Sequence, residues 1–226
     1  MTEILRRHPD RFGPAVPFEW ANEKVLVLDL TAANPDLRTL DLSNTTVFTE
    51  YVFGKMRAAD ARVAVGGYNE DRVIYRRSAH FQAADEPRRI HLGIDVWAAA
   101  GTPVFAPLEG TVHSFGHNDH FGDYGPTILL EHELEKVAFY TLYGHLNLAS
   151  LDGLNAGKKV GRGDRLADIG HYPVNGDWPP HLHFQVIADL RGHRGDFPGV
   201  CTVSERETYL KLCPDANLVL QIGQLR

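Results

Sequence analysis

The stretch that best predicts the fold is Pro179-Pro180-His181-Leu182-His183-Phe184-Gln185-Val186. Side chains alternate between the two faces of a strand, so the imidazoles of His181 and His183 should emerge on one side, about 6.6 Å apart. Leu182 and Phe184 should point to the opposite face and pack into a core. Two imidazoles held side by side suit a metal site or an acid–base site. An exposed strand face that happens to be rich in histidine would give the same pattern.

The composition is that of an ordinary globular protein rich in histidine. The chain has 226 residues, 43% of them hydrophobic, which suits one large domain or a domain with a sizeable appendage. The net charge of -6, with both signs interspersed, predicts no general attraction to nucleic acid or anionic lipid. Histidine, the commonest metal ligand, occurs 12 times. Cys201 and Cys213 could pair, but two thiols do not define the redox compartment, and the oligomeric state stays open.

The sequence gives no sign of a targeting or membrane-spanning segment. The charged first ten residues are followed by no apolar stretch, because Pro14 and Pro17 interrupt residues 12–20. No apolar run approaches the roughly 18 residues needed to cross a bilayer. These features predict a cytoplasmic protein that has no membrane partner.

Residues 88–190 are predicted to form a mainly β domain. Short strand-like runs alternate with Gly and Pro turns at residues 94–97, 103–105, 110–115, 127–132, 137–142, 165–169 and 182–187. A helical period of useful length is not apparent in this region. The fold class expected is therefore mainly β, and α+β overall, with an antiparallel sheet or sandwich that carries a groove.

The N-terminal residues 1–87 are predicted to form a small α/β segment. It should contain a buried strand at residues 25–30 and a helix at residues 46–59, with Thr46 as its cap. A strand, a Gly-Gly turn and a second strand are expected over residues 62–76.

The C-terminal residues 191–226 are predicted to form a tail with a short helix packed on the core. Ser204 and Glu207 have the spacing of a capping box, which would begin this helix. Pro214 would end it.

Two further groups of residues could carry chemistry. In His91-Leu92-Gly93-Ile94-Asp95, a straight strand would separate His91 and Asp95 by about 13 Å. Gly93 could supply a bend that brings them together, although a simple ion pair would explain them equally well. His145, in Tyr143-Gly144-His145-Leu146, follows a predicted strand and could act as a structural hydrogen-bonding group or a catalyst.

Together, the three groups and their flanks resemble the lysostaphin-type zinc metallopeptidases, which include the LytM-like endopeptidases that cut peptidoglycan cross-links. The resemblance covers roughly residues 88–188. The matching stretches are His91-Leu92-Gly93-Ile94-Asp95, Gly101-Thr102-Pro103-Val104 with Ala106, Gly110-Thr111-Val112, Tyr143-Gly144-His145-Leu146, Gly157 with Val160 and Gly163, and His181-Leu182-His183-Phe184.

The resemblance implies a zinc ion bound by His91, Asp95 and His183, with His145 and His181 as the catalytic histidines. Two imidazoles and one carboxylate leave a fourth position for water, as a catalytic zinc requires. The implied function is a zinc-dependent endopeptidase or amide hydrolase acting on a peptide or peptidoglycan-like substrate. Whether His145 or His181 takes the proton is left open.

The sequence departs from the family pattern around the His-x-His pair. Gln185 stands where an acidic residue is common, and residues 175–180 replace a turn rich in Gly, Ser and Thr. Residues 178–185, 195–199 and 212–215 are similar to the peptidase-like module that some bacterial proteins carry between a kinase-like phosphotransferase and a class-III aminotransferase. The substrate class therefore stays open between peptidoglycan and other peptides.

Two other functions fit parts of the pattern. Cupin-type small-molecule binding proteins also carry His-x-His on a β-barrel strand, but they usually add a glutamate after three or four intervening residues, where this chain has Ile187 and Ala188. A catalytically silent LytM-like regulator would keep the fold, but such proteins typically lose metal ligands that are all present here.

Overall fold

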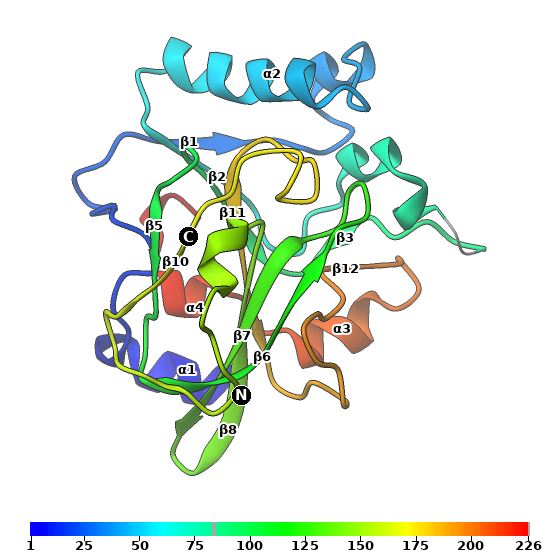
Figure 1. The fold of residues 1–226 in the computed structure, drawn as a ribbon. Coiled ribbons are helices and arrows are strands. Elements are labelled where there is room, and N and C mark those ends of the chain that lie inside the picture. The colour runs from blue at the N-terminus through cyan, green and yellow to red at the C-terminus, as the bar shows by residue number, and fades with distance from the viewer. Residues whose placement is uncertain (83–84, 226) are drawn as a thin grey trace.

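An eight-stranded sheet organises the computed structural model, which describes residues 1–82 and 85–225 (Figure 1). Its strands, in spatial order, are β1 (Val25–Leu28), β2 (Val63–Gly66), β4 (Ile94–Trp97), β11 (His181–Ile187), β8 (Val137–Gly144), β7 (Gly125–Leu134), β6 (Gly110–Asn118) and β9 (Lys159–Val160). Neighbouring strands are antiparallel, except for the parallel pair β1–β2. The predicted mainly β fold with a large antiparallel sheet is confirmed.

Strand β11 lies inside this sheet, and all of its residues are buried. Leu182, Phe184 and Val186 belong to the main apolar core, as the alternation of the sequence predicts. Because neighbours alternate, His181, His183 and Gln185 occupy the other face, which is also covered by protein.

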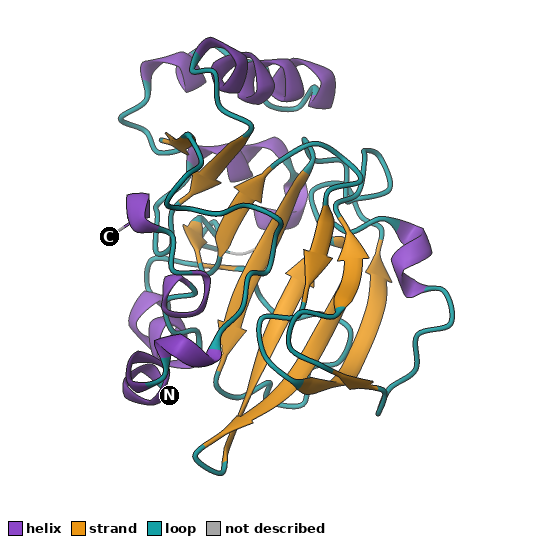
Figure 2. Cartoon of the chain, turned by 90° about the vertical axis from the view of Figure 1, so that its left-hand side faces the viewer, coloured by secondary structure: helices purple, strands orange, loops and turns teal. Residues whose placement is uncertain are grey.

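Two small sheets and several short helices surround the large sheet. Strand β5 (Pro103–Phe105) pairs with β10 (Arg165–Asp168), and β3 (Ile90–His91) pairs with β12 (Val200–Cys201). The α-helices are α1 (Thr2–Arg7), α2 (Thr45–Ala58), α3 (Arg206–Leu212) and α4 (Asn217–Leu220). The 3-10 helices are η1 (Pro9–Arg11), η2 (Pro35–Arg38), η3 (Val73–Arg77), η4 (Ala79–Phe81), η5 (Leu148–Leu151) and η6 (Gly223–Leu225). Figure 2 shows the helices gathered around the sheet.

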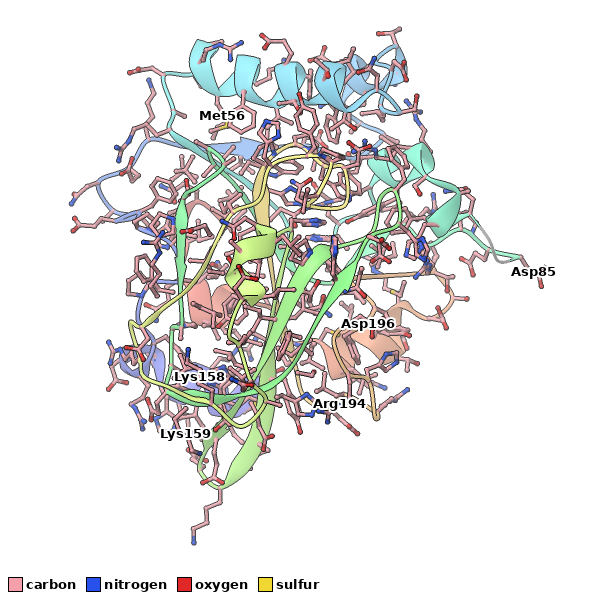
Figure 3. All side chains as sticks on the ribbon, viewed as in Figure 1. Met56, Asp85, Lys158, Lys159, Arg194 and Asp196 are labelled. Atoms are coloured by element: carbon pink, nitrogen blue, oxygen red, sulfur yellow. The ribbon has the colours of Figure 1, made fainter. Side chains whose placement is uncertain are left out.

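The N-terminal segment extends the main sheet rather than forming a separate layer, because β2 pairs with β4. Helix α2 packs beside β1 and β2, and Met56 points from it towards the sheet (Figure 3). The helix begins after Asn44, whose side chain accepts a hydrogen bond from the backbone of Val47, so Thr46 is not the cap. The predicted boundaries at 87/88 and 190/191 stay predictions.

The second strand expected over residues 62–76 is wrong, because the chain forms the 3-10 helix η3 there. Ile74 and Tyr75 are consecutive and both buried, whereas a half-buried strand would expose one of the two. This short helix turns both side chains towards the interior.

The tail helix exists, but the capping box predicted from Ser204 and Glu207 does not form. Helix α3 begins at Arg206, its N-cap Glu205 makes no side-chain capping bond, and Thr202 and Glu205 form a reciprocal pair in the turn before it. The Thr202 hydroxyl donates to the Glu205 carboxylate at 2.9 Å and accepts from the Glu205 backbone N–H at 3.2 Å. The backbone N–H of Ser204 instead donates to Glu86.

Helix α1, near the N-terminus, packs against α4 in the C-terminal tail. Within residues 1–82 and 85–225, no helix has both the length and the apolar character that crossing a membrane requires.

Phe48 is expected to be essential for the packing of α2 on the sheet. Its fully buried ring lies 6.0 Å from Trp97 and 6.3 Å from Trp178, measured between ring centroids. The Phe48→Ala variant should lower the free energy of unfolding by about 3–5 kcal/mol, which chemical denaturation would measure. The neighbouring Val47→Ala, at a 37% exposed position, is the control and should change it by less than about 0.5 kcal/mol. Equal losses in the two variants would contradict the packing described here.

Candidate metal centre

The register of the sheet aligns the histidine pair with its partners. Across the β11–β4 pair, His183 lies directly opposite Asp95 and His181 opposite Trp97. On the other side of β11, His183 lies opposite Gly144, the last residue of β8. His145 follows immediately, so three neighbouring strands deliver Asp95, His183 and His145 to one region.

His91 reaches the same region because the chain bends at Leu92-Gly93, between β3 and β4. A side chain at position 93 would place its Cβ 2.7 Å from the ring of His183, so only glycine fits without a shift. The bend brings His91 Nε2 within 3.2 Å of Asp95 Oδ1.

His91, Asp95 and His183 form a nearly equilateral triangle of ligand atoms. His91 Nε2 is 3.0 Å from His183 Nδ1, which is 3.1 Å from Asp95 Oδ1. In a tetrahedral zinc site with bonds of 2.0–2.1 Å, two ligand atoms are separated by about 3.3 Å. The triangle therefore has nearly the dimensions of three ligands of such a site.

The hydrogen bonds that the His91 and His183 rings make outside the triangle leave no proton on the ring nitrogens that face into it. His91 Nδ1–H donates to the carbonyl of Gly67 at 2.9 Å, which leaves a lone pair on Nε2. The amide N–H of Gln185 donates to the carbonyl of Pro198, so its oxygen accepts from His183 Nε2–H at 2.9 Å. The remaining lone pair, on His183 Nδ1, points into the triangle. Two lone pairs and a carboxylate oxygen thus converge on one point, which is favourable only with a cation there.

Arg72 supports the Asp95 carboxylate from behind. Its guanidinium is buried and pairs with Asp95 Oδ2, while its Nε donates to Glu70 at 2.7 Å. Burial alone would raise the pKa of Asp95, but the electrostatic interactions with the His91 ring and the Arg72 guanidinium outweigh it and hold that pKa well below its usual value. The carboxylate therefore stays charged, with Oδ1 left for the triangle.

His181 and His145 lie beside the triangle with matching tautomers. His181 Nδ1–H donates to Pro179 at 2.7 Å, and His145 Nδ1–H donates to Asn175 at 2.8 Å, so each presents an unprotonated Nε2. Their ring centroids are 4.2 Å apart, and His181 stacks on Trp97. Burial lowers the pKa of His181 to about 4, and burial together with His181 lowers that of His145.

The backbone of His145 is itself unusual. Its φ of 61° lies in the left-handed region, which is costly for a residue with a side chain. The conformation is held by the backbone N–H of His145, which donates to Tyr124 at 2.8 Å. Non-glycine residues in such conformations are concentrated at functional sites.

A pocket of about 120 Å³ opens onto these residues, with Asp95, His145, His181 and His183 in its wall. Trp178 also lines it. The arrangement can bind a metal, present a substrate to it and exchange protons through two imidazoles.

The structure brings all five residues predicted from the sequence together, but the sequence did not reveal three of their partners. Gln185 could have been found, because it lies two residues after His183 and therefore on the same strand face. Arg72 and Tyr124 could not, because they reach the site through the pairing of strands distant in sequence. The Tyr124 hydroxyl lies 3.5 Å from His183 Nε2.

The comparisons with known proteins agree with this geometry. Residues 89–194 match Peptidase family M23. The chain is 34% identical over 139 residues to a protein of Haemophilus influenzae named "Uncharacterized metalloprotease", covering 59% of this chain and 27% of that protein. It is 31% identical over 126 residues to the "DD-carboxypeptidase/endopeptidase Mpg" of Neisseria meningitidis, covering 54% of this chain and 26% of the relative. It thus spans about a quarter of the length of these curated relatives.

Among solved structures, a zinc-containing peptidase from Vibrio cholerae is similar to this chain, with 29% identity and a TM-score of 0.35. The similarity covers 43% of this chain and 28% of that one. Residues 89–194 are therefore similar to peptidase family M23, which supports the resemblance predicted from the sequence.

Proposed function

We propose that this chain is a zinc-dependent metallopeptidase that hydrolyses peptide or other amide bonds with a water molecule activated between His91, Asp95 and His183. The observation that carries the proposal is the triangle of unprotonated ligand atoms, with edges of 3.0, 3.1 and 3.2 Å. Zinc is the metal proposed because tetrahedral sites with histidine and carboxylate ligands and an open position are typical of catalytic zinc.

When bound, zinc would lower the pKa of a water molecule and polarise the scissile carbonyl. His181 is placed to accept the proton, because its free Nε2 lies 3.9 Å from Asp95 Oδ1, beside the triangle. His145, whose ring lies against that of His181, would be the second acid–base group. The ring that takes the proton from the water would carry it on Nε2, where it can stabilise the developing negative charge and then pass to the leaving amine. The two carbonyl acceptors fix both rings in the orientation that these roles need.

The substrate proposed is a peptide or peptidoglycan-like amide. One relative, from Bacillus subtilis, is named L-Ala–D-Glu endopeptidase, and the Neisseria relative is named a carboxypeptidase and endopeptidase. Residues 178–185 are similar to the module of phosphotransferase–aminotransferase proteins. This similarity favours a peptide substrate that is not part of the cell wall. Hydrolysis assays with purified peptidoglycan and with synthetic peptides would separate the two.

The protein should bind one zinc ion per molecule through His91, Asp95 and His183. Elemental analysis after dialysis would measure this, and His183→Ala should lose the metal because it removes one of three ligands. His171→Ala, at an exposed position outside the triangle, is the control and should keep it. Equal zinc contents in the wild type and His183→Ala would refute the assignment.

Arg72→Met should weaken zinc binding without removing a ligand. Asp95 would lose the cation that orients it, and loss of such a supporting group typically costs 10–100-fold in metal affinity. Competition with a chelator would measure the dissociation constant. Arg89→Met, which removes an exposed arginine 3.5 Å from Asp71, should leave it unchanged. An unaltered constant in Arg72→Met would show that Arg72 does not position Asp95.

His181→Ala and His145→Ala should fail differently from His183→Ala. Neither side chain is a proposed ligand, so both variants should keep near-normal zinc while turnover falls by roughly 10²–10⁴-fold, the usual contribution of a positioned acid or base. Zinc content and kcat should be measured on the same preparations. If His181→Ala loses the metal and His183→Ala keeps it, the roles on β11 are exchanged. Full zinc without hydrolysis of any amide would favour a silent regulator or a cupin-like binding protein.

A further inference from the structure

More than half of the residues that line the pocket lie outside the segment 89–194. They are Ile74, Tyr75, His80, Phe81 and Arg88 before the segment, and residues 196–200 after it. We call residues 196–200 the strap. The peptidase domain therefore supplies the candidate metal centre, and the flanking chain supplies much of the wall in front of it.

The strap is held tightly over the centre. It leads into β12, which pairs with β3, and the Leu92 backbone N–H donates to the Gly199 carbonyl at 2.9 Å. A Cβ at Gly199 would lie 1.9 Å from the Tyr124 hydroxyl and 3.4 Å from Cε1 of His183. The strap thus leaves no room for a side chain between Gly199 and the ring of a proposed ligand.

This cover leaves little room for a substrate. The pocket, about 120 Å³, is below the roughly 300–1,000 Å³ usual for small-molecule sites. The five site residues are at most 5% exposed, the value of His145. A long polymer bound at an internal bond needs an open path on both sides of that bond. The pocket instead fits the end of a short chain.

Arg88 gives the pocket a positive charge without a matching carboxylate. Its guanidinium donates to the carbonyl of His80 and lies 5.5 Å from the ring centre of Phe81. In the part of the chain that the structure describes, Arg88 makes no ion pair, whereas its neighbour Arg89 lies 3.5 Å from Asp71. A guanidinium with free N–H groups is the side chain best suited to bind a carboxylate with two hydrogen bonds.

Besides Asp95, which pairs with Arg72, the pocket has two acidic residues, and both have partners other than Arg88. Asp123 accepts a hydrogen bond from the backbone N–H of Tyr124 at 2.8 Å. Asp196, labelled in Figure 3, lies 3.6 Å from His193, on the strap side of the pocket. Neither carboxylate is therefore bound to Arg88, whose charge stays available to a ligand.

Building on the amide hydrolysis proposed above, we propose that the site takes short substrates by a free terminal carboxylate, which Arg88 binds. Arg88 would be a specificity residue, and the scissile amide would lie within a residue or two of the carboxyl end. Blocked peptides and intact peptidoglycan strands would be poor substrates, because they present no carboxylate to Arg88 and exceed the pocket.

The test compares a set of N-acetylated dipeptides and tripeptides, each made as the free acid and as the carboxamide. Wild-type protein should cleave the acids with a kcat/KM about 10–100-fold higher, the range expected for a hydrogen-bonded charge pair. Arg88→Met should abolish this preference by raising the KM for the acids only, and Arg88→Lys should keep part of it. Arg89→Met is the matched control and should retain the full preference.

A binding measurement keeps the test independent of catalysis. Calorimetry with the same acid–amide pairs on metal-free protein should show tighter binding of the acids to the wild type and equal binding to Arg88→Met. Equal binding of acids and amides by the wild type, or a preference that survives in Arg88→Met, would overturn the role of Arg88. Cleavage of amides and acids at equal rates would overturn it while leaving the proposed hydrolase intact. Failure to bind zinc would reject the hydrolase, and the calorimetry would still decide on the carboxylate site.

Discussion

The candidate metal centre depends on one alignment, that of His183 on β11 with Asp95 on β4. A slip of one residue in this pair would place the two side chains on opposite faces of the sheet. The apolar side chains of Leu182 and Phe184, fixed in the main core, oppose such a slip. The packing of one face of β11 therefore determines the chemistry of the other.

The second constraint is the charge on Asp95. A buried carboxylate is costly unless it is paired and hydrogen-bonded, and Arg72 supplies both on the side away from His91 and His183. Arg72 is buried in turn, and Glu70, Tyr75 and the carbonyl of Gly67 complete its partners. The loop between β2 and β3 is thus part of the site, although it carries no proposed ligand.

The sequence predicted the parts of this molecule that repeat locally. Alternation in residues 181–187 and in the other strands predicted the sheet, and the resemblance carried by three short motifs pointed to His91, Asp95, His145, His181 and His183. The sequence did not predict features that depend on contacts between residues far apart in the chain. Residues 72–76 look like a strand, but the burial of both Ile74 and Tyr75 favours a 3-10 helix. Arg72 carries no local signal, because the carboxylate that it pairs with, Asp95, belongs to β4.

The pairing of β3 with β12 also bears on the order in which the molecule assembles. His91 belongs to β3, and β3 is completed only when Val200, far along the chain, has joined it. The packing of α1 on α4 has the same non-local character, and contacts of this kind slow folding. Metal capture would accordingly be a late event, completed after the C-terminal tail has docked. The rate at which newly made protein binds the proposed zinc ion would then measure how fast the C-terminal tail docks.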